Sequence, residues 1–189
     1  MKTIRSFIAI EIAADVRRSL AELQEELVNT VPIGAVRWVA PGNIHLTLKF
    51  LGDTEMSAVG PIESRLEEMA ASFEPFEVRL GKVGCFPNPR RPRVIWVGIE
   101  GDLDLLMRLQ QEVEQGLSEL GWPAEKRRFH PHLTLGRVKD SRQVIEARMP
   151  WGRQRVTGQQ RVTEVCLIES DLQPTGAVYT VLKRASLAG

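Results

Sequence analysis

The chain has 189 residues, of which 43% are hydrophobic and 26% are charged, and its formal net charge is +1. This composition is ordinary for a soluble globular protein, and the length suits one domain or two small lobes that share a core. No apolar run is long enough to span a membrane, and the small net charge excludes a protein that binds polyanions with its whole surface.

The first half of the chain is predicted to alternate strands and helices. Strands are predicted at residues 3–12, 36–39 and 44–51. One helix follows the first strand and a second follows residue 51, after a cap at Asp53 or Thr54. Their apolar stripes consist of Val16, Leu20, Leu23 and Leu27, and of Val59, Ile62, Leu66 and Met69.

The N-terminal segment superficially resembles a signal peptide, because Lys2 and Arg5 precede an apolar stretch. Glu11 and Asp15 interrupt that stretch, and no small-residue cleavage site follows. We therefore interpret it as the first strand and expect a cytoplasmic protein.

The second half is predicted to repeat this alternation, with strands at 76–86, 93–99 and 129–138. Residues 87–92 form a basic loop, Asp102 caps a third helix, and Gly121 and Pro123 end it. The apolar stripe of this helix is expected to consist of Leu103, Leu106, Leu109, Val113, Leu117 and Leu120. A short helical turn at 140–147 precedes a closing hairpin, formed by strands at 161–170 and 177–183 around a turn at 171–176.

One tetrapeptide occurs twice, as His45-Leu46-Thr47-Leu48 and as His132-Leu133-Thr134-Leu135, in a chain with three histidines. Side chains alternate between the two faces of a strand. Each copy therefore buries its leucines on one face and presents its histidine and threonine on the other. Because both copies lie in similar strand–helix–strand contexts, we expect them to form one shared site.

The order of elements divides the chain into two similar halves. The strand at 3–12, a helix and the strand at 44–51 correspond to the strand at 93–99, a helix and the strand at 129–138. This order predicts a duplicated α+β fold with two lobes. Residues 1–189 are expected to form this single bilobal domain, with the motifs opposite each other.

The repeated residue types suit acid–base catalysis on a phosphate ester. An imidazole has an ordinary pKa of about 6.5, so one histidine can activate water while the other protonates a leaving oxygen. Thr47 and Thr134 can hydrogen-bond the non-bridging phosphate oxygens, and Arg137 can neutralise them. Strand alternation places Arg137 on the face opposite His132, so a bulge or a strand end is needed to turn it inward.

Two features have a metal-binding alternative. His130, His132 and His45 can in principle ligate zinc, but no carboxylate or cysteine stands at a supporting spacing. We therefore expect no metal and assign His130 to the structure or to the rim of the site. Cys85 and Cys166 lack metal-ligand spacing and are expected to be buried, reduced thiols.

Aromatic and basic residues suggest where a nucleic acid could bind. Phe7, Trp38, Phe50 and Phe129 flank the motif strands and can stack on a base, although such residues more often belong to a core. Lysines and arginines gather without acids in residues 79–93, 126–139 and 148–161. They indicate a positive face for a phosphate-bearing ligand, and the alternative is that they are solvated loop charges.

The chain resembles the two-histidine phosphoesterases, and within them the RNA 2′,3′-cyclic phosphodiesterases, also called 2′-5′ RNA ligases. The matching segments are RSFIAI (5–10), VRWV (36–39), HLTLKFLG (45–52) and FHPHLTLGR (129–137). The paired HxTx motifs are specific to the superfamily, and these contexts are specific to the family. The resemblance covers essentially the whole chain, and it implies a bilobal α+β fold in which two antiparallel sheets with outer helices place the motifs across a central cleft.

The resemblance implies hydrolysis of a 2′,3′-cyclic phosphate at an RNA 3′ end to a 2′-phosphomonoester, without a metal or cofactor. It implies that His45 protonates the departing 3′ oxygen and that His132 activates water, although near-identical motifs make these roles formally symmetric. Thr47 and Thr134 are implied to hold the phosphate, assisted by Arg137. Joining of RNA ends through a 2′-5′ linkage is the same step reversed.

The expected partner is therefore an RNA 3′ end with a 2′,3′-cyclic phosphate, bound by a monomer that uses no membrane and no metal. Two alternatives stay open: a phosphodiesterase for small cyclic nucleotides, and a non-catalytic module that binds RNA ends. The presence of both histidines counts against the second alternative.

Overall fold

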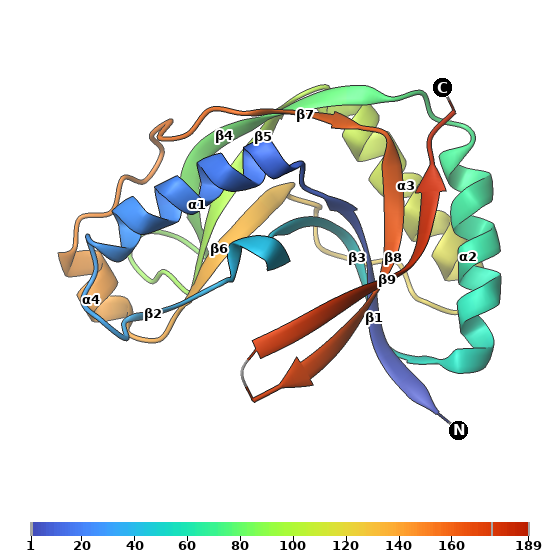
Figure 1. The fold of residues 1–189 in the computed structure, drawn as a ribbon, viewed down its shortest axis with the longest axis horizontal. Helices are drawn as coiled ribbons and strands as arrows, with labels where there is room; N and C mark the ends of the chain where they lie inside the picture. The colour runs from blue at the N-terminus through green and yellow to red at the C-terminus, as the bar shows by residue number, and fades with distance from the viewer. Residues whose placement is uncertain (1, 175, 189) are drawn as a thin grey trace.

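Two antiparallel β-sheets with helices on their outer faces make up the structure, a computed structural model that describes residues 2–174 and 176–188 (Figure 1). The first sheet has the strand order β3-β1-β8-β9 and the second has the order β2-β6-β5-β4-β7. The elements are β1 (Thr3–Glu11), α1 (Ala14–Val28), β2 (Val36–Trp38), η1 (Pro41–Asn43), β3 (His45–Glu55), α2 (Met56–Ala70), β4 (Phe76–Phe86), β5 (Val94–Gly101), α3 (Leu103–Glu119), β6 (His132–Val138), α4 (Ser141–Glu146), β7 (Gln159–Val162), β8 (Glu164–Gln173) and β9 (Gly176–Ser186). The predicted α+β class with two antiparallel sheets is confirmed.

Each motif strand pairs with the strand that precedes its helix. β3 pairs antiparallel with β1 in the first sheet, and β6 pairs antiparallel with β5 in the second. This equivalence confirms the predicted duplication.

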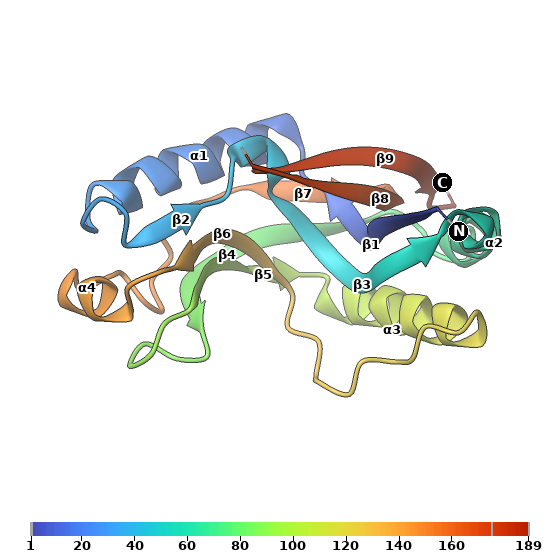
Figure 2. The same cartoon turned by 90° about the horizontal axis from the view of Figure 1, so that it is seen from below.

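The helices that connect these strands are exchanged between the sheets. α1 follows β1 of the first sheet and leads to β2 of the second, and it packs beneath the second sheet, where the Gln24 side chain donates to the carbonyl of Leu135 on β6. α3 links two strands of the second sheet but packs beneath the first, against β3 and beside α2. Figure 1 shows α2 beside β9, and Figure 2 shows α2 and α3 next to each other at one end of the molecule.

Buried apolar side chains from both sheets and all four helices form one continuous core. A smaller cluster lies on the other face of the first sheet and consists of Phe7, Ala9, Cys166 and Ile168, with Tyr179 and Val181 packed against it. The first sheet is therefore apolar on both faces, and its second apolar face surrounds His45.

The predicted strand at 161–170 is wrong, because this segment contains two strands of different sheets. β7 pairs with β4 in the second sheet, whereas β8 pairs with β1 in the first. The chain passes between the sheets at Thr163, and the apolar pattern of a strand carries no information about which partner it pairs with. The predicted closing hairpin is confirmed as β8 and β9, but its turn is shorter than predicted, because residues 171–173 belong to β8 and Gly176 begins β9. Thr175 of the turn lies outside the described residues.

The predicted cap of the second helix is also wrong, because β3 continues to Glu55 and α2 begins at Met56. Thr54 is buried instead, and its hydroxyl bonds the Ser6 hydroxyl at 2.7 Å. The Thr54 side chain, which was predicted to cap the helix, therefore forms a cross-strand hydrogen bond instead.

Both ends of α3 differ in detail from the prediction. Asp102 holds the N-cap position, but its carboxylate accepts the backbone N–H of Glu77 at 3.0 Å rather than one of its own helix. Leu120 is partly exposed at the end of α3 and not part of its buried stripe. The loop at 87–92 and the short helix α4 agree with the prediction, and Asp140 caps α4 by accepting two backbone N–H groups.

The two cysteines are buried and unpaired, as predicted. Burial raises the pKa of the Cys166 thiol to about 12, and the nearby carboxylates of Glu164 and Glu11 act in the same direction. Within residues 2–174 and 176–188, the helices are too short or too polar to cross a membrane.

The packing of Trp96 gives a first test of the structure. A Cβ atom on Gly84 would lie 2.1 Å from the Trp96 ring, whereas one on Gly98 would come no closer to it than 3.4 Å. We expect Gly84→Ala to displace the indole and lower the free energy of unfolding by about 1–3 kcal/mol. Gly98→Ala is the matched control and should cost much less in the same urea denaturation; equal losses would contradict this packing.

Candidate active site

The first motif lies on β3 and alternates as predicted. Leu46 and Leu48 are buried, whereas His45 and Thr47 are half-buried. Across the ladder, His45 lies opposite Glu11 and Thr47 lies opposite Ala9 on β1. The histidine and threonine therefore share the face of the first sheet that carries the smaller apolar cluster.

The second motif has the same arrangement on β6. Leu133 and Leu135 are fully buried, while His132 and Thr134 are half-buried. Thr134 lies opposite Trp96 on β5, and His132 lies opposite Gly98. β3 and β6 contact each other where the two sheets meet, which brings the motifs together (Figure 2).

The two imidazoles are held in the same way. His45 Nδ1 lies 2.8 Å from the carbonyl oxygen of Asn43, and His132 Nδ1 lies 2.6 Å from that of His130. Because a carbonyl oxygen only accepts, Nδ1 carries the proton in both rings. Each Nε2 is therefore the nitrogen left to exchange a proton with a substrate.

Aromatic rings fix the planes of both imidazoles. His45 stacks on Phe7 with ring centroids 4.6 Å apart and meets the edge of Tyr179 at 5.3 Å. His132 meets Phe86 edge-on at 4.9 Å and lies 6.2 Å from Trp96. No pattern in the sequence indicates Tyr179 or Trp96, because only strand pairing brings them beside the histidines.

Burial lowers the pKa of both histidines below its ordinary value, and their hydrogen bonds to backbone carbonyls partly oppose this. The remaining charges differ between the two sites. The Glu11 carboxylate raises the pKa of His45, whereas His130 and Arg137 lower the pKa of His132. The charge of His132 also lowers the pKa of His45, as expected for two facing imidazoles.

Each motif strand contains a β-bulge at the last leucine of its motif. On β1, Ala9 pairs with Thr47 and Ile8 with Lys49, so Leu48 has no partner. On β5, Trp96 pairs with Thr134 and Ile95 with Gly136, so Leu135 has none.

These bulges reverse the alternation that follows them. Arg137 comes to lie opposite Val94, on the same face as His132, and its charge acts on both His132 and Tyr179. Of the two ways predicted to turn Arg137 inward, a bulge or a strand end, the structure therefore contains the bulge. Phe50 is turned in the same way at the first motif, opposite Phe7.

Of the four aromatic residues considered for base stacking, Phe50 is 71% exposed and Phe7 is 3% exposed. Trp38 packs against the core beside Gly136, and Phe129 also packs against the core. Phe50 is thus the ring of this group that a ligand on the His45 side can reach.

His130 supports His132 through its backbone carbonyl, and its ring lies against Phe86 and Trp96 at centroid distances of 5.4 Å and 5.2 Å. Within the described part of the chain, a different group brings metal-ligating atoms within 4.8 Å of one another, namely Glu11, Glu164 and Cys166. The Arg184 guanidinium already pairs with both of these carboxylates.

Residues 35–174 match the model of the 2′-5′ RNA ligase superfamily. The chain belongs to this superfamily. A relative from Methanothermobacter thermautotrophicus named RNA 2′,3′-cyclic phosphodiesterase is 35% identical over 94% of this chain and 95% of its own. A relative of the same name from Aquifex aeolicus is 32% identical over the full length of both chains.

Solved structures of similar proteins show the same fold. The crystal structure of a protein from Thermus thermophilus has a TM-score of 0.79 at 32% identity and covers 98% of this chain and 99% of its own. LigT of E. coli in its apo form also has a TM-score of 0.79, at 26% identity over both whole chains. LigT is also known in complex with 3′-AMP.

The lowered pKa values of His45 and His132 predict a pH-dependent stability. Since both pKa values are lower in the folded chain than the unfolded value of about 6.5, their contribution is fully present above pH 6.5 and is lost as pH falls through the folded values. We expect the free energy of unfolding to decrease between about pH 7.5 and about pH 5.5 in urea titrations. The decrease should be smaller in the double variant His45→Gln, His132→Gln; an equal decrease would show that the histidines are not responsible.

Proposed function

We propose that the protein hydrolyses 2′,3′-cyclic phosphates at RNA 3′ ends to 2′-phosphomonoesters, with His45 and His132 as the acid–base pair. The observation that carries this proposal is the equivalent mounting of the two imidazoles, each with a free Nε2 and a threonine on the same face. The printed names of the relatives and the 3′-AMP complex of LigT support a phosphate-bearing nucleotide end as the substrate class.

In the proposed reaction, water attacks phosphorus in line with the leaving 3′ oxygen, and one imidazole lies on each side of the phosphate. His132 Nε2 takes a proton from water as the water oxygen bonds to phosphorus. The bond from phosphorus to the 3′ oxygen breaks, and His45 Nε2 gives its proton to that oxygen. The phosphate stays on the 2′ oxygen, and solvent exchange returns both imidazoles to their starting protonation.

The surroundings of the two rings favour this assignment over the reverse one. The Glu11 carboxylate favours the proton on His45, as a general acid needs, while Arg137 and His130 disfavour a proton on His132, as a general base needs. Thr47 and Thr134 donate to the non-bridging oxygens, and the Arg137 guanidinium neutralises them.

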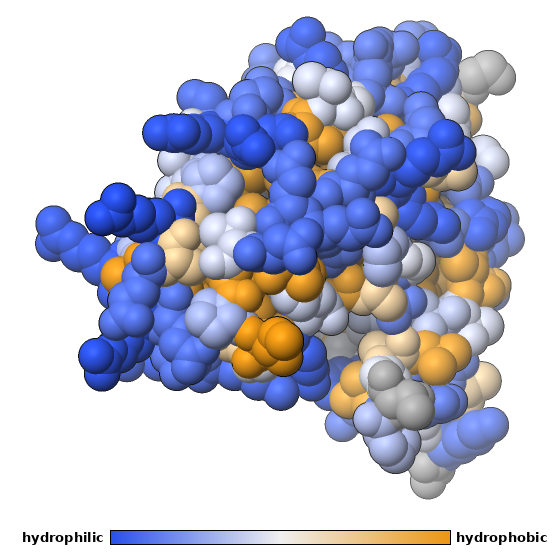
Figure 3. Space-filling model, turned by 60° about the vertical axis from the view of Figure 1, so that its left-hand side comes forward, coloured by the Kyte–Doolittle hydropathy of each residue, from blue (hydrophilic) through white to orange (hydrophobic). Residues whose placement is uncertain are grey.

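The leaving 3′ oxygen remains on the ribose, so the terminal nucleoside lies on the His45 side. Phe50 exposes its ring on this side and can stack on the base. The basic loop at 87–92 and the loop that leads into β6 both project from the lower side of the molecule as drawn in Figure 2. Hydrophilic residues cover most of the face in Figure 3, and apolar groups lie mainly in its centre and lower half.

A second RNA end can replace the water in the same geometry. Its 5′-hydroxyl would attack phosphorus from the His132 side and form a 2′-5′ linkage as the 3′ oxygen leaves. We include this joining reaction in the proposal, together with a monomeric, cytoplasmic protein in which residues 1–189 act as one bilobal domain. Gel filtration with light scattering tests the monomer.

Removal of either imidazole tests the acid–base pair. We expect His45→Ala and His132→Ala each to lower the turnover of a short RNA with a 2′,3′-cyclic phosphate by about 10²–10⁴-fold. Thr163→Ala, at the crossing between the sheets, is the control and should stay active. The assay contains EDTA, and the phosphomonoester is identified by chromatography.

Each result has a defined meaning. A 2′-phosphate formed in EDTA supports the proposed reaction, whereas a 3′-phosphate would reverse the orientation of the substrate. Loss of wild-type activity in EDTA, restored by zinc, would overturn the metal-free scheme. Turnover of small cyclic nucleotides but not of RNA ends would move the function to that substrate class.

The charge of Glu11 has a separate test. Glu11→Gln removes the carboxylate that raises the pKa of His45, so this pKa should fall in an NMR titration and the rate at neutral pH should fall with it. Glu164→Gln is the matched control, because Glu164 also pairs with Arg184 but does not lie opposite His45. A pKa of His45 that stays constant or rises in Glu11→Gln would refute the electrostatic assignment.

A further inference from the structure

At the bulge of each motif strand, the side-chain amide of a buried glutamine lies against the backbone carbonyl of the bulge residue. Gln24 is 5% exposed, and its Nε2 donates to the carbonyls of Leu135 and Val39, both at 2.8 Å. Gln110 is 8% exposed, and its Nε2 lies 3.4 Å from the carbonyl of Leu48. Leu48 and Leu135 are the two bulge residues, whose backbone is displaced from the regular ladder.

The two glutamines occupy equivalent places in the duplicated halves. Residues 20–27 of α1 and 106–113 of α3 share the pattern Leu-x-x-Leu-Gln-x-x-Leu/Val. In both helices the glutamine lies within the buried apolar stripe. The repeat in the sequence therefore extends from the strands into the helices.

A buried amide within an apolar stripe is costly unless it is hydrogen-bonded. The Leu135 carbonyl also accepts the backbone N–H of Val39 at 2.9 Å, so the Gln24 amide adds a second donor to it and ties α1 to both strands that meet there. Because α1 packs beneath the second sheet and α3 beneath the first, each glutamine satisfies its own buried amide at the bulge of a motif strand in the other half of the chain.

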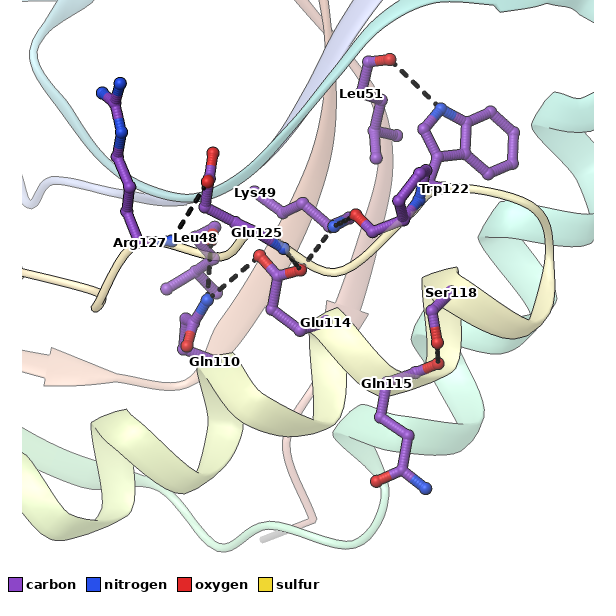
Figure 4. A network of polar contacts seen from close by, with 11 residues as sticks. Leu48, Lys49, Leu51, Gln110, Glu114, Gln115, Ser118, Trp122, Glu125 and Arg127 are labelled. Atoms are coloured by element: carbon purple, nitrogen blue, oxygen red, sulfur yellow. Dashed lines mark hydrogen bonds and ion pairs between the residues drawn. The ribbon is translucent and has the colours of Figure 1, made fainter.

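Around Gln110 the hydrogen bonds continue into a network (Figure 4). Its Nε2 also donates to Glu114 at 3.2 Å, and Glu114 accepts from Lys49 and from the backbone N–H of Glu125. Lys49 follows the first bulge, and Glu125 lies in the loop that leads into β6. The network thus ties the loop before the second motif to the bulge of the first.

We infer that Gln24 and Gln110 are positioning residues, which fix the two bulges and thereby hold Arg137 and Phe50 on the catalytic face. This inference rests on the proposed function, because it assigns Arg137 to the phosphate and Phe50 to the base. In this scheme Gln24 affects activity by keeping Arg137 in place, and Gln110 affects activity by keeping Phe50 in place.

The test compares Gln24→Met with Leu23→Met. Methionine keeps the length of glutamine but donates no hydrogen bond, and Leu23 is a buried neighbour on the same helix that does not bond the bulge. Both variants are assayed on the RNA 2′,3′-cyclic phosphate, well below their melting temperatures. We expect kcat/KM of Gln24→Met to fall by about 10–100-fold, as for a misplaced group of the site, and that of Leu23→Met to stay close to wild type.

A double-mutant cycle separates positioning from general destabilisation. If Gln24 acts through Arg137, then Gln24→Met should leave the rate of an Arg137→Ala enzyme almost unchanged. Multiplicative losses in the double variant would overturn the inference, as would full activity of Gln24→Met.

Amide hydrogen exchange gives a readout that does not depend on activity. Gln24→Met should speed exchange in residues 134–138 relative to the rest of β6 and to Leu23→Met. Uniform exchange changes in both variants would mean that Gln24 only stabilises the core. Should the wild-type enzyme fail to cleave the RNA, the proposed function falls, while the exchange experiment still decides whether Gln24 holds the bulge.

Discussion

Burial of the motif leucines is the constraint on which the rest of the site depends. Leu46 and Leu133 lie in the core, each contributing about 1.5–3 kcal/mol of hydrophobic stabilisation. Since strand side chains alternate, a leucine directed into the core directs the histidine before it and the threonine after it to the opposite face. A slip of one residue would bury these polar groups and expose the leucines. The register that builds the core therefore also builds the site.

The two motifs share their backbone geometry and differ in their surroundings. Both histidines donate Nδ1–H to the carbonyl two residues earlier, and both strands bulge at the second leucine. The charges nearby are opposite, because His45 faces the carboxylate of Glu11 and His132 faces the guanidinium of Arg137. Identical tetrapeptides thus lie among charges that act in opposite directions on the pKa values of their histidines.

The exchange of helices makes the two halves of the chain interdependent. α1 comes from the first half and supports the motif of the second, while α3 comes from the second half and supports the motif of the first. Neither half contains both a motif strand and the helix that meets its bulge. This arrangement couples the formation of the core to the alignment of both imidazoles.

The sequence by itself determined the α+β class, the duplication, the faces of both motifs and the need for a bulge or a strand end to turn Arg137 inward. These features depend on local periodicity, since alternation in a strand and the spacing in a helix are short-range geometry. Only the tertiary structure decided that residues 159–162 and 164–173 belong to different sheets, because a strand does not encode its partner. The same holds for Glu11, Tyr179 and Trp96 beside the histidines, and for Gln24 and Gln110 beneath the bulges. These residues lie far from the motifs in the chain, and strand pairing and helix packing bring them to the site.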